Sequence, residues 1–173
     1  MISPDWCRMM AAYNSEMNRR LYGAADGLDA VAREADGGAF WGSIQGTLCH
    51  LLWGDTTWMS RFDGWEKPSV GMKQSPAMIQ DWAELKARRV AADQKIGSWA
   101  AGLTAENLAA PIAWHSAIIG RDVSMPLWIA AGHFFNHQTH HRGQAHALLT
   151  RAGAATGDTD LPWVLDLAKL GLA

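Results

Sequence analysis

The sequence has few cysteines, no cluster of basic residues and no long apolar run, and each shortage excludes a class of protein. Cys7 and Cys49 are the two cysteines and form no CxxC pair, so a reducing cytoplasm is the expected location. A formal charge of -2 without a basic run argues against a nucleic-acid surface. No run approaches the roughly 20 apolar residues that span a bilayer. The beginning, MISPDWCRMM, lacks the basic and apolar regions of a secretory signal. We therefore expect neither nucleic acid nor a membrane as a partner.

Length and composition indicate one ordinary folded domain, residues 1–173. A chain of 173 residues can bury a sizeable core without a disulfide or a partner. Its hydrophobic fraction of 49% is typical of globular proteins, whereas ten tryptophans are many for this length. Such rings can fill a helical core or line a cavity.

Apolar residues recur at spacings of three and four in four long stretches, which predicts four amphipathic helices. Each stretch follows a serine that can cap free N–H groups at a helix start, and three of these starts also carry a proline. In the third stretch, Val90 is among the positions expected to be buried. The expected helices are residues 4 to about 23, 43–62, 76 to about 102, and 126 to about 152, with caps at Ser3, Ser43, Ser75 and Ser124.

The segments between these stretches predict smaller elements. Residues 28–33 suggest a short helical turn, and β-prone residues 112–119 and 121–124 flank a turn at Gly120. A short helix is expected over residues 162–170. The predicted fold class is therefore all-α, a four-helix bundle with a small β-hairpin between the third and fourth long helices and a short C-terminal helix.

A run of histidines in the last long helix carries the strongest chemical signal. In NHQTHHRGQ, residues 136–144, His137 and His141 are four positions apart and so lie on one helix face, one turn from each other. Two imidazoles at this spacing can reach one metal ion. His50 on the second long helix is the expected third ligand, since the small residues Gly46 and Gly54 on its face leave space before the ring.

The pattern alone leaves other pairings open. His133 has the same spacing to His137, and His140 lies about 60° around the helix from His137 and can compete as a ligand. We favour His137 with His141 because this pair falls in a polar run of an otherwise apolar helix. A single histidine on an apolar helix is more often a hydrogen-bonded core residue. The other histidines are expected outside the site: His115 in the hairpin and His146 on the opposite side of the helix.

Three neutral imidazoles would leave a coordination position open, which is typical of catalytic rather than structural sites. Such an ion can acidify water or bind a thiolate, and zinc, nickel and iron all accept imidazole. Cys49 is next to His50 but should point away, because neighbouring helix residues diverge by about 100°; a buried structural thiol is expected. Arg142 and Gln144 are either partners of the imidazoles or packing residues, for instance through an Arg142–Asp160 salt bridge.

Several segments resemble the DinB family of bacterial damage-inducible proteins. The most specific is NHQTHHRGQ, and a second is GTLCHLLWGDTTWMSRF, which follows shortly after Phe40. Weaker likeness extends from Tyr13-Asn14 and Asn18-Arg19-Arg20-Leu21 to Thr159-Asp160-Leu161, so the resemblance covers most of the chain.

The resemblance implies a four-helix bundle, a homodimer and a three-histidine metal site. It assigns His50, His137 and His141 as the metal ligands and leaves His133 and His140 out. It also implies zinc or nickel, with iron as an alternative, and a low-molecular-weight thiol as cosubstrate, because relatives include thiol-dependent transferases and isomerases. The expected function is thus a metal-dependent thiol S-transferase or hydrolase acting on a small molecule. The alternatives are a non-catalytic metal- or ligand-binding stress-response protein, or a helical module with a polar histidine core.

Overall fold

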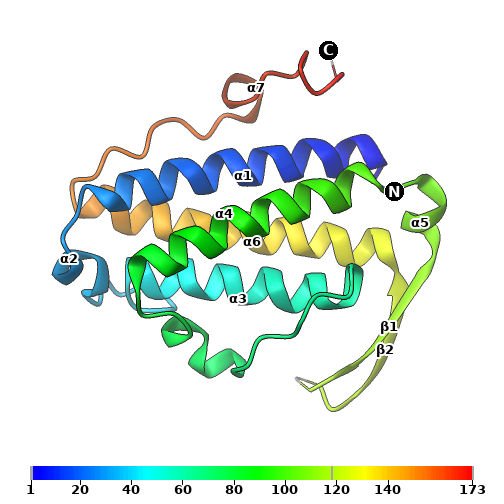
Figure 1. Ribbon diagram of the computed structural model, residues 1–173, viewed down its shortest axis with the longest axis horizontal. Coiled ribbons are helices and arrows are strands. Elements are labelled where there is room, and N and C mark those ends of the chain that lie inside the picture. The colour runs from blue at the N-terminus through cyan, green and yellow to red at the C-terminus, as the bar shows by residue number, and fades with distance from the viewer. Residues whose placement is uncertain (1, 118, 173) are drawn as a thin grey trace.

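Four long helices lie side by side in the computed structural model, which describes residues 2–117 and 119–172 (Figure 1). Helix α1 packs against α4 and α6, and α3 packs against the same two helices. The long helices are α1 (Pro4–Asp26), α3 (Ile44–Phe62), α4 (Trp82–Ala101) and α6 (Leu127–Arg151).

Two of the expected serine caps are confirmed. The Ser3 hydroxyl oxygen accepts the Trp6 backbone N–H at 3.1 Å, and Pro4 occupies the first turn of α1. At the start of α3, the Ser43 hydroxyl oxygen accepts the Gly46 N–H at 2.9 Å. In both places a side chain satisfies a backbone donor that the helix itself cannot reach.

The shorter elements confirm a mostly helical chain with a small antiparallel sheet and a short C-terminal helix. They are α2 (Ala30–Glu34), the 3₁₀-helix η1 (Met72–Ala77), α5 (Ala105–Ala109), β1 (Pro111–Ser116), β2 (Arg121–Pro126) and α7 (Leu161–Val164). The hairpin turns at Gly120, whose φ of 66° suits glycine. Its first strand is shorter than predicted, and Ile118 of the prediction lies outside the described residues. Helix α7 is also shorter than the expected 162–170.

The predicted start of the third long helix is wrong. Ser75 and Pro76 lie in η1, and α4 begins only at Trp82. The cap of α4 is Asp81, whose carboxylate accepts the Glu84 N–H at 2.6 Å. A carboxylate in this position also interacts favourably with the positive end of the helix dipole, so Asp81 defines the start.

The predicted cap of the fourth long helix is wrong as well. Ser124 lies in β2 and pairs with Ala113 of β1, and α6 begins at Leu127 directly after the strand ends at Pro126. The Leu127 N–H is satisfied by the Ala110 carbonyl at 2.9 Å, so the hairpin base replaces a side-chain cap. On α4, Val90 is 58% exposed rather than buried, because it faces away from the other long helices.

The core divides into two apolar clusters with polar residues between them along each long helix. One cluster is built around Leu21, Leu48 and Leu148, and the other around Met59 and Phe134. Buried polar residues of the four helices are linked to one another by hydrogen bonds and ion pairs, and we term them the polar layer: Asn14, Asn18, Asp55, Arg89, Asp93, Gln138 and Arg142.

Within the described residues, no helix is both long and apolar enough to cross a membrane.

Candidate metal centre

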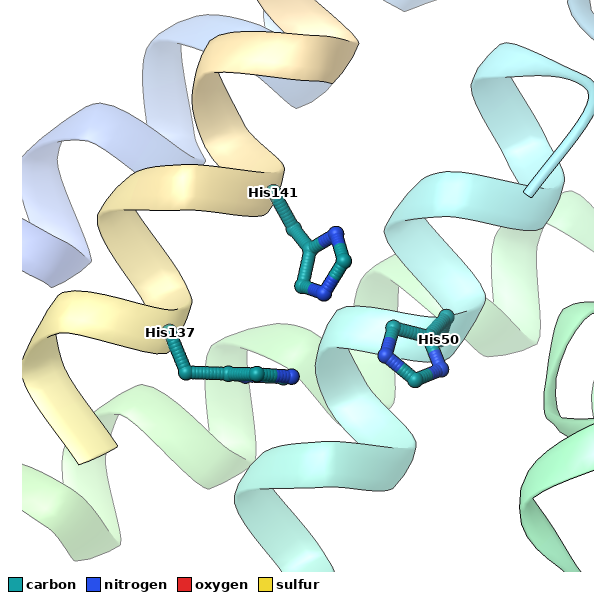
Figure 2. A group of neighbouring side chains, drawn as sticks. All are labelled: His50, His137 and His141. Atoms are coloured by element: carbon teal, nitrogen blue, oxygen red, sulfur yellow. The ribbon is translucent and has the colours of Figure 1, made fainter. Parts of the chain in front are cut away.

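Helices α3 and α6 bring the three predicted histidines together. His137 and His141 project from successive turns of α6 toward His50 on α3 (Figure 2). One nitrogen from each ring lies within 4.8 Å of the others. His50 and His141 are buried, and His137 is half-buried. The geometry therefore forms a group of three imidazoles that could hold a metal ion.

Two of the three rings are oriented by hydrogen bonds on Nδ1. The Ser75 hydroxyl donates its proton to the Met72 carbonyl at 2.6 Å, so the same oxygen accepts from His50 Nδ1–H at 2.7 Å. His141 Nδ1–H donates to the Gln144 side-chain oxygen at 2.7 Å. These partners select the Nδ1–H tautomer and leave the Nε2 lone pair of both rings free to face the group.

The free nitrogens are suited to bind a metal ion. His50 Nε2 is buried and has no hydrogen-bond partner among the described residues, and the same holds for His137 Nδ1. A buried acceptor without a donor costs about 1–3 kcal/mol, so native structures rarely contain one without a bound partner. A cation in the centre of the three rings would satisfy the lone pair of His50 Nε2.

The surroundings keep the imidazoles neutral. Burial lowers the pKa of His50 to about 3, with smaller contributions from His141 and His137. Burial likewise lowers the pKa of His137 to about 4, followed by the effects of neighbouring histidines. The pKa of His141 is also lowered, mainly by burial. Neutral imidazole is the form that binds a metal, so these side chains are ready ligands at neutral pH.

Close packing fixes two of the rings. The Trp41 indole stacks on His50 with ring centroids 3.8 Å apart. A Cβ at Gly54 would lie 2.9 Å from Cε1 of His137, so a larger residue does not fit there. The expected open space at Gly54 is thus filled by His137, and Gly46 instead approaches the Trp41 carbonyl and Pro76.

The three rings line one cleft of about 410 Å³. His133 and His140 line it too, but the group within 4.8 Å does not include them. His133 is exposed and lies 5.0 Å from Trp58 between ring centroids. The other lining residues are mostly aromatic or small: Phe40, Trp41, Trp53, Gly54, Thr57, Trp58, Arg61, Met72 and Gln144.

The remaining candidates lie outside the group. His115 pairs with Asp122 in the hairpin at 2.9 Å, and His146 contacts the Thr156 hydroxyl at 2.7 Å. Cys49 is buried, and its sulfur accepts the Ile79 N–H at 3.3 Å. Burial raises the pKa of this thiol, as expected for a structural cysteine that points away from His50.

Sequence reasoning missed two residues that shape the site. Ser75 resembled a helix cap, and only the return of η1 against α3 places its hydroxyl on His50. Trp41 precedes α3 and reaches His50 through a tight turn in which Gly42 has a φ of 75°. A glycine followed by a serine cap gives a local signal for that turn. The contacts of Ser75 and Trp41 with His50 have no signal in the sequence.

The polar layer lies beside the histidine group and draws its residues from all four long helices. Arg89 donates a hydrogen bond to Asp55 at 2.6 Å and forms an ion pair with Asp93 at 2.8 Å. Gln138 donates its amide to the other Asp55 oxygen at 2.9 Å. Arg142 bonds to side chains of the layer and of its own helix, so the expected salt bridge to Asp160 is wrong; its acceptors are Asn14 and Thr139.

Comparison with known proteins identifies the family. A comparison with curated proteins and one with solved structures returned no significant match. A family model described as the DinB family matches residues 4–171. Membership and the three-histidine group are together compatible with metal binding. Since the match spans nearly the whole chain, the protein belongs to the DinB family.

Proposed function

We propose that His50, His137 and His141 bind one divalent metal ion, zinc or nickel. The observation that carries this proposal is the buried His50 Nε2, which has no partner within the described part of the chain while Ser75 holds Nδ1. Zinc and nickel are favoured because both accept imidazole readily, and iron is the alternative. Three protein ligands would leave a position open toward the cleft.

We further propose that the centre serves a thiol S-transferase or a hydrolase. An ion held by three imidazoles supplies a Lewis acid that lowers the pKa of a thiol or of water. The chain contributes the orientation of the rings, through Ser75 and Gln144, and a cleft with aromatic walls. The thiol is favoured over water by the resemblance to thiol-dependent relatives.

The architecture around this centre completes the proposal. Each of α1, α3, α4 and α6 packs on two of the others, which supports a single four-helix bundle with the histidines on the facing sides of α3 and α6. A cytoplasmic location, where low-molecular-weight thiols stay reduced, and assembly as a homodimer belong to the same proposal.

Metal analysis of single variants tests the site. The purified protein is expected to contain close to one zinc or nickel per chain by elemental analysis, and His137→Ala is expected to abolish this content. His140→Ala is the matched control, because His140 lies in the same cleft outside the group. Full metal occupancy in His137→Ala would overturn the site.

One observation favours a non-catalytic metal- or ligand-binding protein as the second candidate. Among the described residues that line the cleft there is no carboxylate to act as a general base. A screen for turnover with glutathione, mycothiol and bacillithiol, with and without metal, separates the two. Metal-dependent turnover supports the enzyme, whereas a marked fall in Tm on metal removal without any turnover supports the binding protein.

A further inference from the structure

Arg61 places a positive charge in the same cleft as the three histidines. It lies near the end of α3 and is half-buried. Its guanidinium carbon is 4.3 Å from the ring centroid of Trp58 and 5.0 Å from that of Trp114 on β1. Two indole rings thus hold the cation at the cleft wall, with the hairpin supplying one of them.

This arginine lacks the partner that a half-buried cation usually has. Over residues 2–117 and 119–172, Arg61 makes neither an ion pair nor a hydrogen bond, and burial lowers its pKa. A carboxylate within about 4 Å would restore the interactions lost with water. Other arginines of the chain do have carboxylate partners: Arg8, Arg19, Arg20, Arg88 and Arg89.

The cleft as a whole is suited to an anion with an apolar body. Of its described lining residues, Arg61 is the one with a permanent charge, and none is acidic. A metal at the histidines would add further positive charge to the same cleft. Indole rings give the cleft apolar walls, among them those of Trp53 and Trp58.

We propose that the cleft binds small molecules that carry a carboxylate, and that Arg61 binds this carboxylate while the other end of the molecule faces the three histidines. Arg61 would then determine substrate specificity. The part of this proposal that concerns the three histidines rests on the proposed function, namely a bound metal ion that activates a thiol or water. The binding of the carboxylate requires only the cleft and its cation.

The fold sets the length of the ligand. Gly54 is the residue of α3 that lies against His137. Arg61 is seven residues further along α3, which is about 10 Å along the helix axis. The guanidinium lies over Trp58, three residues back, so the side chain leans toward the histidines and shortens this span. A reactive atom and a carboxylate separated by roughly five or six methylene groups fit the interval.

Calorimetric titration of the zinc-loaded protein with two matched probes tests the proposal. The probes are 6-mercaptohexanoate and 6-mercaptohexanol, which share the thiol and the chain and differ in the anionic group. We expect the acid to bind at least about tenfold more tightly, because it gains a charge-assisted bond to Arg61. Arg61→Gln is expected to remove this preference, and Arg61→Lys to keep part of it.

Lys95→Gln is the matched control for net charge. Lys95 also lies over an indole, 4.4 Å from the Trp65 centroid, but it lines a different cleft. The variant should retain the preference for the acid. Circular dichroism and thermal unfolding verify that each variant is folded. If Arg61→Gln does not fold, the preference for the acid is compared between Arg61→Lys and the wild-type protein.

Failure of the inference and failure of the proposed function give different results. Equal binding of acid and alcohol by the wild-type protein, or an unchanged preference in Arg61→Gln, would overturn the role of Arg61. If zinc does not tighten the binding of either thiol, the thiol function fails instead. Hexanoate and hexanol, which lack the thiol, then test Arg61 on the same proteins by the same criterion.

Discussion

Replacing Gly54 with alanine should separate metal affinity from stability. The added Cβ would lie 2.9 Å from His137 Cε1, whereas ordinary contacts begin at 3.4 Å. The imidazole must therefore move by about 0.5 Å or rotate, while metal–ligand distances tolerate only about 0.2 Å. We expect zinc affinity to fall about 10- to 100-fold, the range seen when the support of a ligand is lost.

Stability should respond differently. Alanine in place of glycine within a helix stabilises a protein by about 0.5–1 kcal/mol, and this gain opposes the crowding at His137. Gly97→Ala in α4 is the matched control, since no described atom beyond the neighbouring residues of its own helix lies within 4 Å of the position that its methyl group would occupy. It should raise Tm by about 1–4 °C without changing zinc affinity.

Competition titrations against a chromophoric chelator measure zinc affinity for both variants, and thermal unfolding of the metal-free proteins measures stability. Wild-type zinc affinity in Gly54→Ala would refute the reasoning, because it would show that His137 binds no metal in this position. A similar loss of zinc affinity in Gly97→Ala would show that the titration responds to any substitution in the helices rather than to the metal site.

Three further predictions concern residues around the site and in the core. Ser75→Ala should lower zinc affinity about tenfold, because His50 loses the acceptor that holds its Nδ1–H. Arg89→Met should lower the free energy of unfolding by about 3–5 kcal/mol in urea, because it leaves two buried carboxylates without their cation. Burial raises the pKa of Cys7 to about 11. At pH 8 only about one such thiol in a thousand is ionised, so Cys7 should react with a thiol reagent only after unfolding.

Each of these predictions has a contradicting result. Unchanged zinc affinity in Ser75→Ala would mean that the tautomer of His50 is fixed by other contacts. An Arg89→Met protein as stable as the wild type would mean that the carboxylates of the polar layer become protonated at little cost. Rapid labelling of Cys7 in the folded protein at pH 8 would contradict its burial, with free cysteine as the reference for the rate.

The sequence predicted the long helices because periodicity and local caps act within a few residues. Ser3 and Ser43 are such caps. Ser75 and Ser124 look like caps in the sequence too, but the prediction is wrong at both positions. Ser75 instead hydrogen-bonds to His50, and Ser124 pairs in the hairpin. Helix α5 was missed although its start is local: Thr104 forms a reciprocal capping box with Asn107.

The site was predictable in part for the same physical reason. The spacing of His137 and His141 is a property of one helix. His50 was expected from the small residues on its helix face, and the family resemblance supported this choice and left His133 out. The structure places His50 within 4.8 Å of the α6 pair. Nothing local could place Trp41 on His50 or Arg61 between two indoles, because these contacts join segments that are brought together only by folding.

The polar layer explains two residues of NHQTHHRGQ that ligand spacing leaves unexplained. Gln138 and Arg142 follow His137 and His141 by one residue, so they repeat the same spacing on the adjoining face of α6. Gln138 bonds to Asp55, which follows Gly54, and this bond therefore joins α3 to α6 beside the Gly54–His137 contact. A slip of one residue between the helices would move the rings by about 1.5 Å and break the buried bond. We infer that the polar layer holds α3 and α6 in the register at which their histidines meet.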